Sequence, residues 1–429
     1  MTAAAPVRAG ALTTDILDVE RLSPAFLAEW AAAADHPINQ PFVVLDCWRE
    51  LCRADGALQV IAVRRGGELV GVAPLARGGG PVRRWIAPSH AEVGRVNFVV
   101  RDDPAEVVGA ALAAVMQAGA DVIEVPTVTT DSRTYVGLQA AAARLGLAWI
   151  EDPICDVPYK RLEGGWDAVW KSINGDTRRK FGQQERRLQK LGELTYAEHR
   201  EAENLDALLA ECFEIEASGY KGDQRTAIKY REAEGRFWRR FIPDALQAGT
   251  LSIYTLRLSG RLISYEISLK HAGVIYAMKH GTDVRVEAQA PGNALHLNIF
   301  RQEAAAGTFP FYDFAGEMTE WKRRWSKDVL SMVGIRLYAS GPRGRMAYWT
   351  GPGFRRGVKH VPGAMTVVSS LRDFRKKLAM RFRQWRNPMV ESKGSESAAA
   401  PSPQTQSVNL PKGNSHDRED GDAVQQQGD

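Results

Sequence analysis

The sequence predicts an α+β fold with two successive halves, each a mixed, mostly antiparallel sheet flanked by helices. Apolar and polar residues alternate along several short runs, most regularly from Ile263 to Lys270, and this period of two indicates β-strands. The order strands, helix, strand, helix occurs once before Trp166 and again after it, which indicates two halves of one architecture. After Gly341 the composition changes, so we expect that segment to lie outside both halves.

The composition is that of a globular protein without a membrane span. The chain has 429 residues, 44% of them hydrophobic, which is enough for two domains and a tail. No apolar run approaches the roughly 20 residues that cross a bilayer, and residues 1–14 lack the apolar core of a signal peptide. We therefore expect a cytoplasmic protein. The four cysteines show no metal-binding spacing, so we expect reduced thiols and no metal.

The first half carries recognisable helix starts and a hairpin turn. Ser23 and Pro24 are typical of a helix N-cap and first turn. The turn from Arg65 to Glu68 contains two glycines between apolar runs, which predicts a β-hairpin. Further elements are expected at 40–51 (helix), 58–63, 69–75 and 96–100 (strands), 104–117 (helix), 122–125 (strand) and 135–145 (helix).

The second half is predicted in more detail. Its strand around Ile263 has two faces: Ile263, Tyr265, Ile267 and Leu269 on one, and Ser264, Glu266, Ser268 and Lys270 on the other. Helices are expected at 166–191, 205–215, 237–246 and 295–306, and strands at 251–258, 262–270, 274–280 and 311–317.

The loop before the helix at 295–306 has the residues of a phosphate-binding turn. It reads Gln289-Ala-Pro-Gly292-Asn293-Ala294 and joins a strand to a helix. Small residues there let the backbone approach a ligand, and the free N–H groups and dipole of a helix start suit a pyrophosphate. The sequence therefore predicts a phosphate site at Gln289, Gly292, Asn293 and Ala294.

These residues resemble those of the GNAT acyltransferase superfamily, in which Gln/Arg-x-x-Gly-x-Gly/Ala holds the pyrophosphate of acyl-CoA. The neighbouring text is similar to the CelD-like branch (the BioF-like acetyltransferase domain), a relative of the FemAB tandem-GNAT aminoacyltransferases; that branch usually has Trp at the position of Tyr220. The matching segments are Glu216–Gly222, Ala290–Gly292, Tyr312–Phe314, Lys322 with Trp325, Arg178–Arg179 and Arg186–Leu188.

The resemblance implies two tandem GNAT-like domains, with acetyl-CoA or another acyl-CoA as co-substrate and no metal. The segments expected are a flexible N-terminus (1–14), a GNAT-like domain without a cofactor loop (15–160), an acyl-CoA-binding domain (161–340), a basic segment (341–390) and a disordered tail (391–429). The resemblance also implies that the backbone at Met278 and Lys279 contacts the thioester.

Three side chains are candidates for catalysis. Glu266, on the polar face of its strand, is a candidate general base with a raised pKa; alternatively that face is simply exposed. Asp313 and Lys322 come with the family pattern: Asp313 would face the substrate and Lys322 would pair with it or steady an oxyanion, or both are structural. His271, His280 and His296 are interpreted as packing or solvent-facing residues.

The acceptor side is expected around Glu216, Tyr220 and Lys221, although the same residues would also suit a plain helix end. Arg178 belongs to a basic helix with Arg179, Lys180, Arg186 and Arg187. That helix is either a solvated face or a positive wall beside an anionic substrate or the CoA phosphates.

A basic helix with an aromatic stripe is predicted at 365–385, which would either pack on the core or bind anionic membrane from the cytoplasmic side. Three functions follow from these features. The first is an acyl-CoA-dependent N-acyltransferase, an acetyltransferase by preference, acting on a small-molecule or glycan-precursor amine in envelope or exopolysaccharide synthesis. The second is a FemAB-like transferase using aminoacyl-tRNA, and the third a non-catalytic accessory protein of polysaccharide assembly. The near-neutral bulk of the chain disfavours a nucleic-acid partner.

Overall fold

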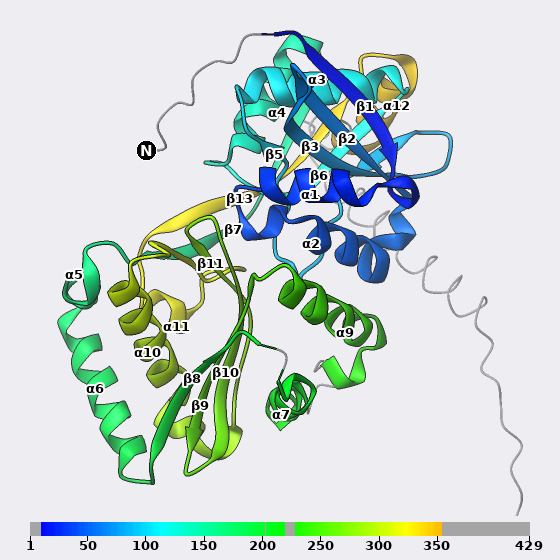
Figure 1. Ribbon diagram of the computed structural model, residues 1–429. Coiled ribbons are helices and arrows are strands. Elements are labelled where there is room, and N and C mark those ends of the chain that lie inside the picture. Colours follow the sequence, from blue (N-terminus) through cyan, green and yellow to red (C-terminus); the bar gives the residue numbers. More distant parts are fainter. Residues whose placement is uncertain (1–9, 202, 219–227, 354–429) are drawn as a thin grey trace, which may run out of the picture. The chain divides into compact units, whose positions relative to one another are not determined.

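The computed structural model describes residues 10–201, 203–218 and 228–353 (Figure 1). Four predicted features lie wholly or partly outside the described residues: residues 1–9 of the expected flexible N-terminus, Tyr220 with Lys221, the basic helix at 365–385, and the tail from 391. In the described part of the chain thirteen strands form one sheet, whose order is β1-β2-β3-β4-β6-β13-β7-β12-β11-β10-β9-β8, with β5 beside β3. The pairs are antiparallel except β4–β6 and β11–β12, so the predicted mixed, mostly antiparallel α+β fold is confirmed.

The first half begins with the predicted helix start: Ser23 Oγ accepts a hydrogen bond from Phe26 N, and Pro24 opens the helix. The hairpin β2–β3 forms around Gly66 and Gly67, which both have positive φ. The elements are β1 (Leu12–Asp18), α1 (Pro24–Ala33), α2 (Pro41–Asp46), β2 (Ala57–Arg65), β3 (Glu68–Arg77), β4 (Arg84–Ile86), β5 (Val99–Val100), α3 (Pro104–Gln117), β6 (Val122–Thr129), α4 (Arg133–Leu145) and β7 (Ala148–Arg161).

The second half follows the predicted order, but the helix expected at 166–191 is broken. Asn174 accepts a hydrogen bond from Asp176 N and caps a new helix, because a polar cap followed by Gly175 ends one helix and starts the next. The elements are α5 (Gly165–Lys171), α6 (Gly175–Gln189), β8 (Leu194–His199), α7 (Leu205–Ser218), α9 (Glu232–Gln247), β9 (Leu251–Leu258), β10 (Arg261–His271), β11 (Val274–Thr282), α10 (Pro291–Ala306), β12 (Phe311–Asp313), α11 (Glu320–Arg323), β13 (Val329–Tyr338) and α12 (Pro342–Tyr348).

Helices cover both faces of the second-half sheet (Figure 1). On one face α5, α6 and α10 enclose a core that includes Phe181, Phe300 and Trp325. On the other face α7 and α9 cover the sheet, and Trp238 of α9 shares a core with Tyr265 of β10. Residues of the first half, such as Val93, belong to the same core. The two faces of the second-half sheet are therefore covered by different helices and different side chains.

The two faces of β10 are as predicted except at Ile263. Tyr265, Ile267 and Leu269 face the α7 and α9 side, whereas Ile263 packs with the α10 side. The reason is a register shift between Leu262 and Ser264, which inserts one residue and reverses the alternation. The polar face is also not exposed, because α10 covers it and Glu266 is fully buried.

The strand β13 joins the halves. It follows β12 and α11 in the chain but pairs with β6 and with residues 148–158 of β7. The last three residues of β7 pair instead with β12. Residues 329–338, which the sequence assigned to the second domain without an expected strand, therefore form a strand that pairs with β6 of the first half.

Candidate functional site at the opening between β11 and β12

The strands β11 and β12 separate after a short paired stretch. They pair at only three positions, ending at Tyr276 with Asp313. Beyond Tyr276, no strand of the described residues pairs with that edge of β11. On its other edge the pairing with β10 passes from Lys279 to Ala277, so Met278 is a bulge residue. A bulge at the edge of an opening leaves backbone groups available to a ligand.

The opening leads to the start of α10. Ala290 has φ 51° and turns the chain into the helix, and no side chain caps the first turn. A Cβ on Gly292 would lie 3.3 Å from Thr282 Oγ1, so this glycine lets the helix lie close to β11. The Asn293 amide donates to Gln184 Oε1 of α6 at 2.9 Å. Gln289, Gly292, Asn293 and Ala294 are thus brought together, and the uncapped N–H groups fit a pyrophosphate.

Beneath this helix start lies a buried polar cluster around Glu266. Its carboxylate accepts hydrogen bonds from Ser268 Oγ and Tyr312 Oη, both at 2.7 Å, and lies 3.0 Å from His296 Nε2. Burial alone raises the pKa of Glu266, but the contacts with His296, Tyr312 and Ser268 outweigh it and lower that pKa. The expectation of a raised pKa is therefore wrong, because hydrogen bonds stabilise the carboxylate.

Pairing with Asp313 was one of the alternatives for Lys322, and the two side chains form no ion pair with each other in the described part of the chain. Asp313 is fully buried, is ion-paired with Arg95 of the first half, and accepts from Ala315 N at 2.9 Å. The Lys322 ammonium donates to the carbonyls of Ala315 and Glu317. Burial lowers the pKa of Lys322 to about 8, with Asp313 raising it in part. The Lys322 side chain is thus an ammonium group whose pKa is close to neutral pH, and the charge of Asp313 favours its protonated form.

On the other face of β11 two carboxylates share one ammonium. Lys279 Nζ lies 2.9 Å from Glu216 Oε1 and 3.3 Å from Glu92 Oε2, and Trp238 Nε1 donates to Glu92 at 2.8 Å. Tyr265 Oη is buried beside them without a hydrogen-bond partner in the described part of the chain. The predicted residue Glu216 therefore lies next to the Met278 bulge.

The loop from Ser89 to Asn97 of the first half supplies residues that sequence reasoning missed. Glu92 contacts Lys279, Val93 O accepts from Tyr276 Oη at 2.8 Å, and Arg95 pairs with Asp313. In the sequence this loop carries no pattern of glycines or caps that would single it out. It instead brings charged side chains to the second half.

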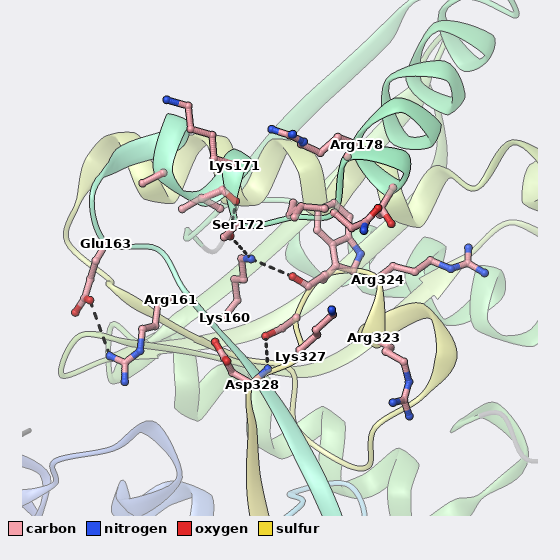
Figure 2. Close-up of a pocket in the computed structure, with 18 residues that line it drawn as sticks. Lys160, Arg161, Glu163, Lys171, Ser172, Arg178, Arg323, Arg324, Lys327 and Asp328 are labelled. Carbon is pink, nitrogen blue, oxygen red and sulfur yellow. Dashed lines mark hydrogen bonds and ion pairs between the residues drawn. The ribbon is translucent and has the colours of Figure 1, made fainter.

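Arg178 lies elsewhere, in a hollow on the α5 and α6 side (Figure 2). None of residues 289–294 lines this hollow, so Arg178 and the helix start of α10 are not in one cavity. Arg178 is half-buried in this hollow, whereas Arg179, Lys180, Arg186 and Arg187 are exposed to solvent, as expected of a solvated helix face.

Two further searches of the described residues concern metals and membranes. They contain no group of three or more His, Cys, Asp or Glu side chains placed to hold a metal, and all four cysteines are free thiols. None of their helices combines the length and apolar character needed to cross a bilayer.

Comparisons with known proteins fit this geometry. Residues 175–323 match the family described as acetyltransferase (GNAT) domain. A crystal structure of FemX shares the fold, with TM-score 0.54 and 16% identity over 76% of this chain and 98% of FemX. The chain thus carries a GNAT domain, and the class of enzyme is an N-acyltransferase acting on an amine. The GNAT match is to residues 175–323, and the chain as a whole shares the fold of FemX.

Two other solved structures are similar at lower scores. A conserved protein of unknown function from Bacteroides thetaiotaomicron gives TM-score 0.49 and 12% identity, covering 76% of this chain and all of that one (100%). A tandem GNAT protein from the clavulanic acid biosynthesis pathway gives 0.41 and 14%, covering 77% and 99%. No curated protein sequence matches the chain.

Proposed function

We propose that the second half is an acyl-CoA-dependent N-acyltransferase, an acetyltransferase by preference. The observation that carries this proposal is the uncapped start of α10 at Gly292, which packs close to β11, a strand that is bulged at Met278 and separates from β12. The pyrophosphate would lie on the N–H groups of Gly292 and Ala294, with Gln289 and Asn293 at its sides. The first half has no such loop, so one CoA binds per chain.

The acyl thioester supplies an activated carbonyl carbon. The free amine of the acceptor attacks that carbon, the C–N bond forms, the C–S bond breaks, and CoA leaves as the thiol. The backbone at Met278 and Lys279 would polarise the carbonyl, since Met278 is unpaired in the ladder with β10 and the opposite edge of β11 has no strand partner there among the described residues. The ammonium group of Lys322 would hold the backbone turn at Ala315 and Glu317 beside the opening.

A base must accept the proton of the attacking amine. Because the acceptor is proposed to approach on the side of the sheet that α7 and α9 cover, the base should lie there. Glu92 is the carboxylate we assign, because its side chain is 16% exposed whereas that of Glu216 is 2% exposed. Both lie within 3.3 Å of Lys279, beside the bulge. Glu266 is assigned a positioning role, since its carboxylate is enclosed beneath α10. Asp313 would fix Arg95 and so hold the first-half loop against the site.

The acceptor would approach over Glu216, which lies beside Lys279 and the Met278 bulge. The CelD-like resemblance favours an amine on an envelope or exopolysaccharide precursor, acylated at the cytoplasmic side. An aminoacyl-tRNA donor, as in FemAB-like enzymes, is the competing assignment, and CoA binding separates the two.

Titration calorimetry with acetyl-CoA tests the proposal. The parent chain should bind one CoA, and Gly292→Glu should weaken binding at least about tenfold, because a carboxylate would occupy the pyrophosphate position. Gly79→Glu is the matched control: the same substitution in a first-half loop where a Cβ meets nothing within 4 Å. Equal affinity in the parent and Gly292→Glu, two sites per chain, or binding of aminoacyl-tRNA without CoA would each refute the assignment.

A further inference from the structure

A hollow of about 770 Å³ lies between the end of β7, the turn from α5 to α6, and the segment after α11 (Figure 2). Seven cationic side chains line it against two carboxylates. The cations that the argument uses are Lys160, Lys171, Arg178, Arg323, Arg324 and Lys327. Figure 2 shows these basic groups coming from three separate segments around Lys160.

Most of this positive charge is not neutralised by the protein. Among the described residues, Lys171, Arg323, Arg324 and Lys327 form no ion pair with an acid, and Arg178 packs over the Trp170 ring instead. Of the two carboxylates, Glu163 lies 3.9 Å from the seventh cation, Arg161. Gathering unpaired cations in one hollow is unfavourable without a partner, so the arrangement indicates an anionic ligand.

The floor of the hollow is built from buried donors. Lys160 is 5% exposed, and its ammonium donates to Ser172 Oγ at 2.6 Å and to the Trp325 carbonyl at 3.0 Å. Trp325 is 1% exposed, and its indole N–H has no hydrogen-bond partner among the described residues. Asn174, Gly175 and Thr177 at the start of α6 also line the hollow, so the positive end of that helix dipole faces it.

We propose that this hollow binds the oligophosphate group of a second ligand, separate from acyl-CoA. One phosphate carries about two negative charges, whereas five unpaired cations match a di- or triphosphate. Arginine forks at Arg178, Arg323 and Arg324 suit the bidentate geometry of phosphate oxygens. The site does not include residues 289–294, so both ligands can be bound at once.

The hollow is close to α10, the helix whose start is proposed to bind CoA. Trp325 lines the hollow and also contacts α10. Its ring lies 5.8 Å from that of His296, which in turn contacts the Gly292 carbonyl on α10. A phosphorylated ligand held beside Arg324 would therefore lie on the opposite side of one aromatic wall from the acyl-CoA site.

The test is titration calorimetry of the full chain with inorganic pyrophosphate, with and without saturating CoA. With CoA saturating the start of α10, pyrophosphate should still bind at one site, and the double substitution Arg323→Glu/Arg324→Glu should weaken that binding at least about tenfold. Arg179→Glu is the matched control: it lies on α6 outside the hollow, is exposed and pairs with Asp176, so affinity should change less than about twofold. The milder Arg323→Gln/Arg324→Gln should weaken binding in the same direction, and thermal melting checks the fold of each variant.

Three results would overturn the inference: equal pyrophosphate affinity at saturating CoA in the parent and in both double variants, loss of all pyrophosphate binding at saturating CoA, or sulfate binding as tightly as pyrophosphate. Displacement of pyrophosphate by a single-stranded RNA oligonucleotide that binds more tightly and with steep salt dependence would reassign the hollow to nucleic acid. Gly292→Glu should retain pyrophosphate binding, which makes failure of this site distinguishable from failure of the acyl-CoA site.

Discussion

His296 joins Glu266 to the first turn of α10. Its Nε2 lies 3.0 Å from Glu266 Oε2, and its Nδ1 lies 2.7 Å from the Gly292 carbonyl oxygen. The strand β10 and the helix start are therefore fixed to each other through one imidazole ring. Since Gly292 is the residue that must approach a pyrophosphate, the position of the cofactor loop depends on a carboxylate that does not contact the ligand.

We expect Glu266→Gln to destabilise the protein at pH 7 by about 1–3 kcal/mol. The folded pKa of Glu266 is lowered from its ordinary value of 4.5, so its stabilising effect is present above that value. The effect is lost as the pH falls through the folded pKa, and the gap between parent and variant should close there. Urea unfolding from pH 7 to pH 3.5 measures it, with exposed Glu287→Gln as control. A gap that stays constant with pH would contradict the assignment.

The buried pair Arg95 and Asp313 should be coupled. Asp313 raises the pKa of Arg95 despite burial, and both side chains are at most 4% exposed. Arg95→Met should cost about 3–5 kcal/mol, because it leaves Asp313 buried without its partner. The double variant with Asp313→Asn should cost less than the sum of the single changes.

Denaturant unfolding of this cycle can be compared with the exposed pair Arg336 and Asp152, where Arg336→Met should cost less than about 1 kcal/mol. If the changes in unfolding free energy from the Arg95 and Asp313 substitutions simply add, the two side chains do not stabilise each other.

Lys322 should make stability rise between pH 8 and pH 10.5. Its folded pKa of about 8 is below its ordinary 10.5, so the unfolded chain binds more protons in this window. Raising the pH there removes a burial penalty of about 3 kcal/mol, which is fully present below pH 8. Lys322→Met should lack this rise when unfolding of parent and variant is compared across the window. Parallel curves for the two proteins would show that Lys322 is not the group involved.

Glu92→Gln should lower turnover about 10²- to 10⁴-fold once an acceptor amine is known, because the amine would lose its proton acceptor. Release of free CoA thiol measures this, and calorimetry should show unchanged CoA affinity. Glu92→Asp should restore part of the rate, and the exposed residue Glu29→Gln serves as control. Full turnover in Glu92→Gln would transfer the role of base to another group.

The sequence predicts those elements of the fold that depend on a few neighbouring residues. The cap at Ser23, the hairpin at Gly66 and the strand-to-helix turn at Gly292 each depend on a few neighbouring residues. The break between α5 and α6 also has a local cause, because Asn174 before Gly175 can cap a new helix. The amphipathic run over residues 166–191 nevertheless predicts one helix.

The contacts that define the candidate site are long-range, and periodicity does not report them. Glu92 meets Lys279 across 187 positions, and Arg95 meets Asp313 across 218. The lowered pKa of Glu266 depends on His296 and Tyr312, which come from a later helix and strand. A pattern within one strand shows that Glu266 is on the polar face, but not that other elements cover it.

The placement of β13 has a consequence for biosynthesis. Residues 148–158 of β7 and the strand β6 gain their shared neighbour only when Val329–Tyr338 has been made. At about 5–20 residues per second, translation from the end of β7 to β13 takes roughly ten to thirty seconds. During that interval both strands expose an unpaired edge on the ribosome, which is the kind of edge that recruits chaperones or aggregates. The amino-terminal half is thus the first to be synthesised and cannot be the first to finish folding.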